Sequence, residues 1–393
     1  MALQIPLHIQ TSQPWSLPSP SSLFSLGDSY SAGIGANCGW VTDAFDPYLE
    51  CLRCLGSYAY HLGNLTSAPP FHNSSHVYHI ACTASDTHDI THRSADKNRT
   101  SQVDLMQNVT EGVTWGLLTI GGNDVGFGSI VANCIAFNRP SCDQDLNFTE
   151  GAIVDRKVVK RLAKTYMAVL NAATADNFTL IVPGYSQFFN SQTKGCDAQY
   201  LFFGRYLTRE LRNRVNQMVI GFNLIIQIAV ASVQLHLVFT NSQKAIYYED
   251  WDGLFEGHRF CEESPQTWAD SWFFTIDGPD TLPNGTVTRA KDIGRRYRGN
   301  EGVAICKATV NLSYEMQIAC NIAWHEKLNG GEAYVEMYPW WAMKIMHPKT
   351  IAHHALAERI YKKWVEGDYF LVKNDCIARK ADELDLVEDL REL

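Results

Sequence analysis

The chain has 393 residues, of which 46% are hydrophobic and 19% are charged, a composition typical of a globular protein with a large apolar core. Its formal net charge is −9 at pH 7, so the chain lacks the basic balance that nucleic-acid binding requires. Acidic residues gather in the last stretch, "ADELDLVEDLREL", and predict a solvated acidic tail over residues 371–393.

Five short apolar runs predict strands. In chain order they are "LFSLG" from Leu23, "HVYHIAC" from His76, "TWGLLTIGG" from Thr114, "FTLIVPGY" from Phe178 and "LHLVFTN" from Leu235. Most of them run into Gly, Ser, Asn or Asp, which is typical of parallel strands that are buried on both faces.

Helical patterns alternate with these strands. One covers residues 152–175, a second covers residues 208–233, and a third, "HHALAERIYKKW", follows Pro348 in its first turn. This alternation predicts an α/β fold with a parallel sheet, in which ligands bind at the carboxyl ends of the strands. Residues 243–345 are rich in aromatic residues and loops, and we expect long insertions that shape the pocket.

The most apolar run, "MVIGFNLIIQIAVASVQLHLVF", is interrupted by Asn223, Gln227 and Gln234. We therefore expect a buried helix followed by a strand there, and no transmembrane segment.

Cysteines and glycosylation sequons favour a secreted protein. The 11 cysteines stand at positions 38, 51, 54, 82, 134, 142, 196, 261, 306, 320 and 376, and eight Asn-x-Ser/Thr sites begin at positions 64, 73, 98, 108, 147, 177, 284 and 311. Residues 1–22 lack the basic start and apolar run of a signal peptide. We therefore interpret 1–22 as a leader or a truncated start of an extracellular protein, with a cytoplasmic location as the alternative.

The chemistry-bearing residues follow the predicted strands. Ser29, in "GDSYSAG", is a candidate nucleophile, although the Gly-x-Ser-x-Gly elbow of the α/β-hydrolases is absent. Asn123, in "TIGGNDVGFG", and the backbone N–H of Ala84, in "ACTASDT", are candidate donors to an oxyanion. His347 stands just before the last predicted helix and is the candidate base.

In this order, "GDSYSAG", "GGND" and "HPKTIAHH" resemble the motifs of the SGNH, or GDSL-type, hydrolases over residues 23–370, and "RCLGSYAYHL", "PGYSQFF" and "FEGHRFC" resemble its secreted esterase branch. The resemblance implies a three-layer, flavodoxin-like α/β/α sandwich. It implies that Ser29 is the nucleophile and His347 the base, and that Ser29 N–H, Ala84 N–H and the Asn123 side chain form the oxyanion hole.

The chain departs from that family at two positions. Alanine stands at position 84 where the family usually has glycine, but a backbone N–H donor tolerates alanine if its φ and ψ are allowed. Lys344 stands where the family often has an aspartate that orients the histidine. We therefore expect a Ser–His dyad oriented by the main-chain carbonyl of Lys344, with the Glu336 carboxylate as an alternative. Asp28 and Asp124 are expected to be supporting residues, with Asp124 bracing the loop under Ser29.

Several residues have competing interpretations. Asp89 and His92 form a rival Asp-x-x-His pair, but they follow the second strand rather than precede the last helix. His353 and His354 are expected to cap or line the final helix, and His258 to be either structural or pocket-lining. Trp340 and Trp341 are expected either to wall an acyl pocket or to pack in the core.

We expect disulfides rather than metal ligands or redox chemistry at Cys51-Leu-Arg-Cys54, because a second pair of zinc ligands is missing and no helix begins there. The expected pairs are Cys134–Cys142, Cys196–Cys261, Cys306–Cys320, and Cys38 with either Cys51 or Cys54.

The sequence thus predicts a monomeric carboxylic ester hydrolase that acts on a small-molecule or lipid ester through an acyl-enzyme and needs no cofactor or metal. A carbohydrate acetylesterase, and a secreted binding module that kept the fold without catalysis, are the alternatives.

Overall fold

The computed structural model describes residues 22–38, 51–67, 76–93, 99–110, 112–136, 138–199, 204–263, 270–275, 278–288, 296–298, 334–336 and 344–370. Almost all of the predicted leader and the whole predicted acidic tail lie outside these ranges. Cys306, Cys320, Trp340 and Trp341 also lie outside them, so the predictions for these residues stay untested.

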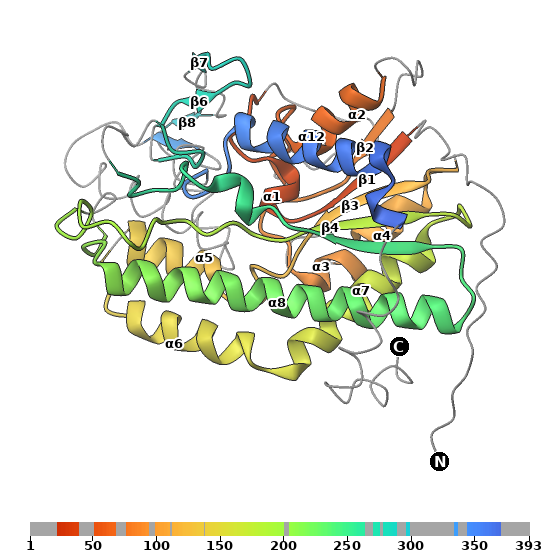
Figure 1. Ribbon diagram of the computed structural model, residues 1–393, viewed down its shortest axis with the longest axis horizontal. Coiled ribbons are helices and arrows are strands. Elements are labelled where there is room, and N and C mark those ends of the chain that lie inside the picture. The colour runs from red at the N-terminus through yellow and green to blue at the C-terminus, as the bar shows by residue number, and fades with distance from the viewer. Residues whose placement is uncertain are drawn as a thin grey trace.

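A five-stranded parallel sheet forms the centre of the molecule (Figure 1). Its strands are β1 (Ser22–Gly27), β2 (His76–His79), β3 (Trp115–Thr119), β4 (Thr179–Pro183) and β5 (Ala245–Glu249). They lie in the order β2-β1-β3-β4-β5, and all four neighbouring pairs are parallel. This is the flavodoxin-like order, and every residue of β1, β3 and β4 is buried because helices cover both faces.

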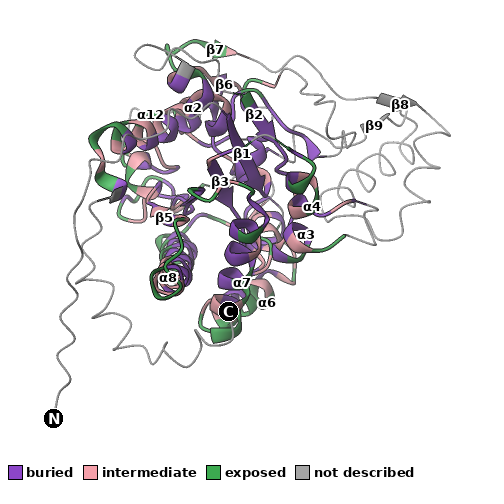
Figure 2. Ribbon diagram, turned by 90° about the vertical axis from the view of Figure 1, so that its right-hand side faces the viewer, coloured by how far each residue is buried: buried purple, intermediate pink, exposed green. Residues whose placement is uncertain are grey.

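Helices form the two outer layers, which confirms the three-layer α/β/α sandwich (Figures 1 and 2). One layer contains α2 (Tyr58–Ser67) and α12 (Thr350–Glu366). The other contains α3 (Thr87–Thr91), α4 (Gln102–Gln107), α6 (Cys142–Ile153), α7 (Arg156–Ala172) and α8 (Arg209–Phe239). Two short helices, α1 (Ser29–Ala32) and α5 (Phe127–Ile130), follow β1 and β3.

Smaller elements complete the part of the chain that the structure describes. They are the π-helix η2 (Val131–Ala136), the 3₁₀ turns η3 (Asp252–Phe255) and η4 (Asp368–Phe370), and two antiparallel pairs, β6 (Asp280–Thr281) with β7 (Val287–Thr288) and β8 (Arg296–Arg298) with β9 (Tyr334–Glu336).

The predicted fifth strand, "LHLVFTN", is wrong. Residues 235–239 continue helix α8, which ends at Phe239, and the strand that pairs with β4 is Ala245–Glu249. The apolar run keeps its helical hydrogen bonding until Asn241, whose φ of +53° turns the chain. A short apolar stretch at the end of a long helix has the composition of a strand, so the pattern alone cannot separate the two.

Two predicted helix boundaries also shift. The pattern over 152–175 corresponds to α7, which begins at Arg156. Asp155 caps this helix by accepting the N–H of Lys157 at 2.9 Å. The preceding helix, α6, was not predicted. Pro348 precedes the Lys349 N-cap of α12 rather than lying in the first turn.

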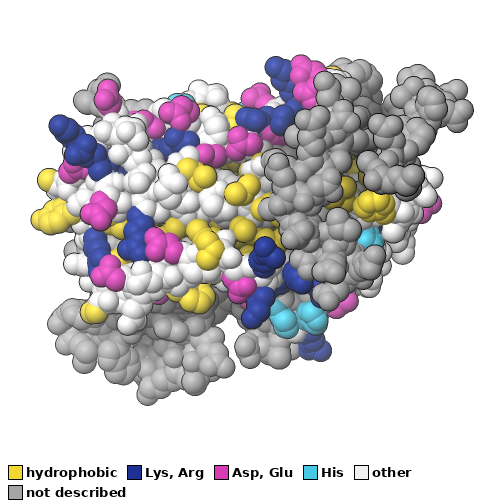
Figure 3. All heavy atoms as spheres, turned by 60° about the horizontal axis from the view of Figure 1, so that its bottom comes forward, with side chains coloured by type: hydrophobic (Ala, Val, Ile, Leu, Met, Phe, Trp, Pro, Cys, Tyr) yellow, Lys and Arg dark blue, Asp and Glu magenta, His cyan; other side chains and the backbone are white. Residues whose placement is uncertain are grey.

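Helix α8 is long and apolar enough to cross a membrane by length and composition, but half of its most apolar window is buried inside the protein, as in core helices, so it is only a weak candidate. Ile220 and Leu224 of α8 and Phe148 of α6 are exposed. Figure 3 shows hydrophobic side chains interspersed with charges of both signs on the face where these helices lie.

Four disulfides join described cysteines. Cys134–Cys142 and Cys196–Cys261 form as expected, and Cys38 pairs with Cys54, one of its two expected partners. The remaining bond, Cys51–Cys82, was not predicted. It joins the start of the segment before α2 to the loop that follows β2, two segments whose proximity exists only in the folded sheet.

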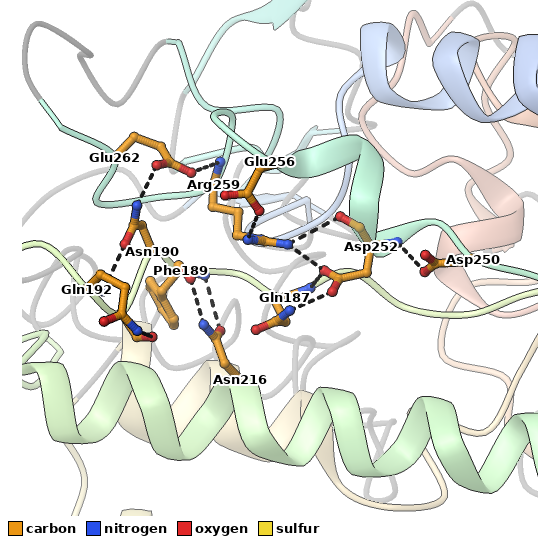
Figure 4. A network of polar contacts seen from close by, with 11 residues as sticks. Gln187, Phe189, Asn190, Gln192, Asn216, Asp250, Asp252, Glu256, Arg259 and Glu262 are labelled. Atoms are coloured by element: carbon orange, nitrogen blue, oxygen red, sulfur yellow. Dashed lines mark hydrogen bonds and ion pairs between the residues drawn. The ribbon is translucent and has the colours of Figure 1, made fainter.

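The stretches "PGYSQFF" and "FEGHRFC" lie side by side in a polar network (Figure 4). Asp252 accepts the backbone N–H of Gln187 at 2.7 Å and also binds the Arg259 guanidinium at 3.0 Å. Asn190 donates to Glu262 at 2.7 Å. These contacts fix the loop that follows β4 against the loop that follows η3.

Buried histidines predict acid sensitivity of the fold. Burial lowers the pKa of His61 to about 4, that of His79 to about 3, and that of His353 well below its usual 6.5. Between pH 6.5 and about 4 the unfolded chain therefore binds protons that the folded chain does not, and the free energy of unfolding falls as pH falls. Asp28, whose pKa burial raises to about 7, and Asp124 and Asp280, whose pKa values burial also raises, act in the opposite direction, but burial lowers the pKa of more histidines, including His258 and His347.

We predict that His353→Phe makes this pH dependence shallower, because the ring is buried between Tyr58 and Trp251 and phenylalanine does not titrate. The slope of the unfolding free energy should drop by up to about 1.4 kcal/mol per pH unit. Urea unfolding at several pH values from 4.5 to 7 measures the slope, and an unchanged slope in the variant would contradict the assignment.

Candidate active site

Ser29 stands where β1 ends, on a turn shaped by Gly27 and Asp28. Gly27 has a φ of +121°, and a Cβ there would lie 2.2 Å from the Thr119 carbonyl oxygen, so the turn requires glycine. The Asp28 carboxylate accepts the N–H of Tyr30 at 2.9 Å and caps α1. The chain therefore changes direction abruptly at the strand end, and the Ser29 side chain is left half-buried there.

His347 approaches Ser29 from the segment before α12. Its Nε2 lies 2.7 Å from the Ser29 Oγ, and its Nδ1 lies 3.0 Å from the Ile345 carbonyl oxygen. A carbonyl only accepts hydrogen bonds, so Nδ1 carries the proton and Nε2 accepts the Ser29 hydroxyl. This tautomer is the one a general base needs.

The carbonyl hydrogen-bonded to Nδ1 is that of Ile345, one residue after the expected Lys344. Met346 has a φ of +62°, so the chain turns sharply just before His347 and brings the Ile345 carbonyl under the ring. The expected Lys344 carbonyl also acts on the imidazole as a hydrogen-bond acceptor, and it accepts the backbone N–H of His347 at 3.0 Å, while the Lys344 ammonium donates to the Gly278 carbonyl at 2.7 Å. The side chain of the alternative orienter, Glu336, lies outside the described residues.

Asn123 lies at the carboxyl end of β3, beside the strand that carries Ser29. Its Nδ2 donates to the Ser85 carbonyl at 2.7 Å, in the loop that follows β2. An amide nitrogen has two hydrogens, so this exposed side chain has a second N–H beyond the one that binds Ser85. The structure thus joins the loops that follow the second and third predicted strands, "ACTASDT" and "TIGGNDVGFG".

Ala84 adopts a left-handed backbone with a φ of +62°. This conformation is favourable for glycine and costs an alanine energy, which gives a physical reason for the glycine usual at this position in the resembled family. The residue is half-buried and lies between Cys82, whose N–H donates to the Gly27 carbonyl at 2.9 Å, and Ser85. Hydrogen bonds at Cys82 and Ser85 thus hold the backbone on either side of Ala84, and they keep the alanine in this conformation.

Asp28 also links the Ser29 turn to the Asn123 loop. Its second oxygen accepts the Tyr185 hydroxyl at 2.5 Å, and that hydroxyl oxygen accepts the N–H of Gly122 at 3.0 Å. Burial raises the pKa of Asp28 to about 7, and the hydrogen bonds from Tyr185 and Tyr30 oppose the rise. Tyr185 was not singled out in the sequence, although it stands in "PGYSQFF".

Asp124 braces a different loop from the one expected. Its carboxylate accepts the backbone N–H and the hydroxyl of Thr87 at 3.0 and 2.5 Å, and it pairs with Arg161 of α7 at 3.2 Å. The side chain thus holds the loop of Ala84 and Ser85 rather than the turn under Ser29. The position of Asp124 next to Asn123 in the sequence could not show which of these two loops it braces.

Burial controls the charge of the imidazole. It lowers the pKa of His347 to about 4, and the hydrogen bonds to the carbonyls of Ile345 and Lys344 oppose the lowering. At neutral pH His347 is therefore neutral and able to accept a proton. The carbonyl partner supplies a dipole where a carboxylate would supply a full charge.

In the rival pair, Asp89 faces Arg99 at 3.8 Å and the exposed His92 contacts Thr91, whereas the ring in contact with the Ser29 Oγ is that of His347. Asp86, His88 and Asp89 bring three possible metal-ligand atoms within 4.8 Å of one another, but Asp86 already caps α3 by accepting the Asp89 N–H.

Two further histidines that the sequence singled out, His354 and His258, have partners of their own. His354 contacts Glu358 at 3.2 Å on α12, and the His258 ring stacks on Trp272 with ring centroids 4.2 Å apart.

Known proteins resemble the chain at low identity. Lipase 1 of Streptomyces coelicolor is 25% identical over 252 residues, which cover 63% of this chain and 76% of that protein. The extracellular lipase of Streptomyces rimosus has a crystal structure with 21% identity and a TM-score of 0.48, and phospholipase A1 of Streptomyces albidoflavus has one with 23% identity and a TM-score of 0.46. Each covers 68% of this chain and 92% of its own. No protein-family model matches the sequence.

The curated relative, together with the order of the three motifs, supports an SGNH/GDSL-type hydrolase that cleaves carboxylic esters. The four disulfides are consistent with a secreted protein.

We predict that the His347 ring titrates well below the usual histidine pKa. In NMR spectra of protein with ¹³C-labelled histidine, its ring signal should stay constant between pH 8 and 5.5 and move only as the pH approaches about 4. The signal is assigned by its loss in His347→Gln. A midpoint near 6.5 would contradict the burial that the structure gives this ring.

Proposed function

We propose that the protein is a serine esterase in which Ser29 and His347 form a catalytic dyad. The observation that carries the proposal is the 2.7 Å contact between the His347 Nε2 and the Ser29 Oγ, two side chains 318 residues apart in the sequence. Serine hydroxyls are weak nucleophiles on their own, and a base within hydrogen-bonding distance is the usual means of activating them.

In the proposed first half-reaction, the Ser29 Oγ attacks the ester carbonyl carbon while its proton passes to the His347 Nε2. The tetrahedral intermediate then collapses, the alkoxide takes the proton from Nε2, and the alcohol leaves. In the second half-reaction water attacks the carbonyl carbon of the acyl-enzyme while one of its protons passes to the His347 Nε2. The second tetrahedral intermediate then expels the Ser29 Oγ, which takes that proton back from Nε2, and the acid leaves.

The proposed oxyanion hole comprises the backbone N–H groups of Ser29 and Ala84 and the free amide N–H of Asn123. The hydrogen bond from Asn123 to the Ser85 carbonyl supports this assignment, because it fixes the amide beside the loop that carries Ala84. Donors that are fixed before the reaction stabilise the oxyanion without reorganising, which is the main source of their effect.

His347 is oriented by a main-chain carbonyl, whereas a triad enzyme uses a carboxylate at this place, and this difference affects how the rate enhancement is divided between the groups of the site. The Ile345 carbonyl holds the Nδ1 tautomer but stabilises the imidazolium less than an aspartate would. We therefore propose that the oxyanion hole contributes a larger share of the rate enhancement here than in a triad enzyme.

We propose a lipid or other acyl ester as the substrate. The support for this proposal is that the relative from Streptomyces coelicolor is named Lipase 1. A carbohydrate acetylesterase remains the alternative within the same chemistry. The binding module without catalysis is disfavoured by the intact contact between Ser29 and His347.

Hydrolysis of p-nitrophenyl esters from acetate to palmitate tests the function. We predict measurable hydrolysis by the wild type, loss to background in Ser29→Ala and His347→Ala, and a fall of kcat of about 100-fold or more in Asn123→Ala because one oxyanion donor is lost. Activity that survives in Ser29→Ala would remove the serine mechanism. A wild type inactive on every ester would favour the binding module.

We further propose that the protein is secreted and glycosylated. Protein expressed in a eukaryotic secretory system should shift in mobility on reduction, because four disulfides restrain the chain, and again on enzymatic deglycosylation. A mobility unchanged by both treatments would favour the cytoplasmic alternative.

A further inference from the structure

The Gln102 side chain binds the strand end that leads to Ser29. Gln102 is the first residue of α4 and is 3% exposed. Its Oε1 accepts the N–H of Gly27 at 2.7 Å, and its Nε2 donates to the carbonyl of the same residue at 2.8 Å. The amide therefore pairs with both the N–H and the C=O of Gly27, as the backbone of a neighbouring strand would. Gly27 stands two residues before the proposed nucleophile, Ser29.

The same amide reaches the second loop of the site. Nε2 donates to the Ser85 Oγ at 3.2 Å, and Ser85 follows Ala84 directly. The Ser85 carbonyl in turn accepts the amide of Asn123 at 2.7 Å. One buried side chain thus connects the segments that carry all three proposed oxyanion donors.

The orientation of this amide is unambiguous. A Gly27 N–H requires an oxygen opposite it, and a Gly27 carbonyl requires an N–H, so exchanging the oxygen and nitrogen of Gln102 would replace both bonds by repulsive contacts. Buried polar networks of this kind rigidify the groups that they join when every member is paired.

We propose that Gln102 is a positioning residue that sets the spacing between the nucleophile turn and the oxyanion loop. The inference rests on the proposed ester hydrolysis and extends it to a residue that touches no substrate. Oxyanion donors act only within a narrow distance of the developing charge, and a misplacement of about 1 Å can cost about 100-fold in rate.

The role is separable from the folding of α4. The Ser101 hydroxyl caps this helix by accepting the N–H of Asp104 at 3.0 Å, a contact that does not involve the Gln102 side chain. The Gly27 carbonyl also accepts the N–H of Cys82 at 2.9 Å, so β1 stays attached to the loop after β2 when the amide is removed. Replacing Gln102 should therefore loosen the site more than it disrupts the fold.

The chain contains a matched control. Asn216 on α8 is 2% exposed and pairs its amide with both backbone groups of one residue, Phe189, at 3.3 and 2.6 Å (Figure 4). Gln102→Met and Asn216→Leu each remove a buried amide that bridges an N–H and a C=O, but only the first lies beside the proposed dyad.

The test measures kcat, KM and Tm of both variants on p-nitrophenyl butyrate. We expect both to lower Tm, while Gln102→Met alone lowers kcat by about 10- to 100-fold with KM changed less than about threefold. Combined with Asn123→Ala, Gln102→Met should cost less than it does alone, because one of the three donors whose placement depends on it is already missing.

Ser85→Ala provides a second variant if Gln102→Met does not fold, since it removes only the contact to Nε2 and leaves the Gly27 pairing intact. We expect a fall in kcat of several-fold at an almost unchanged Tm. Equal kcat losses in Gln102→Met and Asn216→Leu, or no kcat loss in Ser85→Ala, would overturn the positioning role while the ester hydrolysis stands. A wild type without esterase activity would overturn the proposed function, and the positioning role with it.

Discussion

The hydrogen bond between the Ser29 Oγ and the His347 Nε2 is the contact on which the site depends, and it joins the first strand of the sheet to the segment before the last helix. The fold must therefore hold α12 in place to a fraction of an ångström. The buried Glu249 at the end of β5 does so by binding Arg359 at 2.7 Å and Lys363 at 2.9 Å, both of which lie on α12. A carboxylate without solvent is stable only when its charge is matched in this way.

Polar side chains connect the three strand ends that surround this hydrogen bond. Tyr185 links Asp28 to Gly122, and Gln102 links Gly27 to Ser85. Each linking group is buried, so its hydrogen bonds do not compete with water and a broken bond leaves an unsatisfied group. Beyond the strand ends the chain has only the short helices α1, α3 and α5 and the turns that lead to them, so these side chains supply the connections between segments that strand pairing supplies within the sheet.

The architecture could be predicted because strands and helices follow local patterns, and the residues of the proposed dyad could be named because their motifs stand in the order of a family that the chain resembles. Apolar runs that end in glycine and asparagine located β1, β3 and β4, and the order of the motifs located Ser29, Asn123 and His347. The fifth strand was misplaced because the apolar end of α8 has the composition of a strand. Contacts between distant segments, such as Cys51–Cys82 or Gln102 with Gly27, leave no trace in a local pattern. The Ile345 carbonyl contacts the imidazole only because Met346 takes a left-handed backbone, which nothing in its residue type suggests.

The most direct measurement of the central claim is the site and rate of covalent labelling by diethyl p-nitrophenyl phosphate, a reagent that phosphorylates activated serines. We expect a single adduct, located on Ser29 by mass spectrometry, that forms at least about 100-fold more slowly in His347→Ala, because the imidazole that takes the serine proton is then missing. An adduct on another residue, or labelling of Ser29 at an unchanged rate without that imidazole, would contradict it.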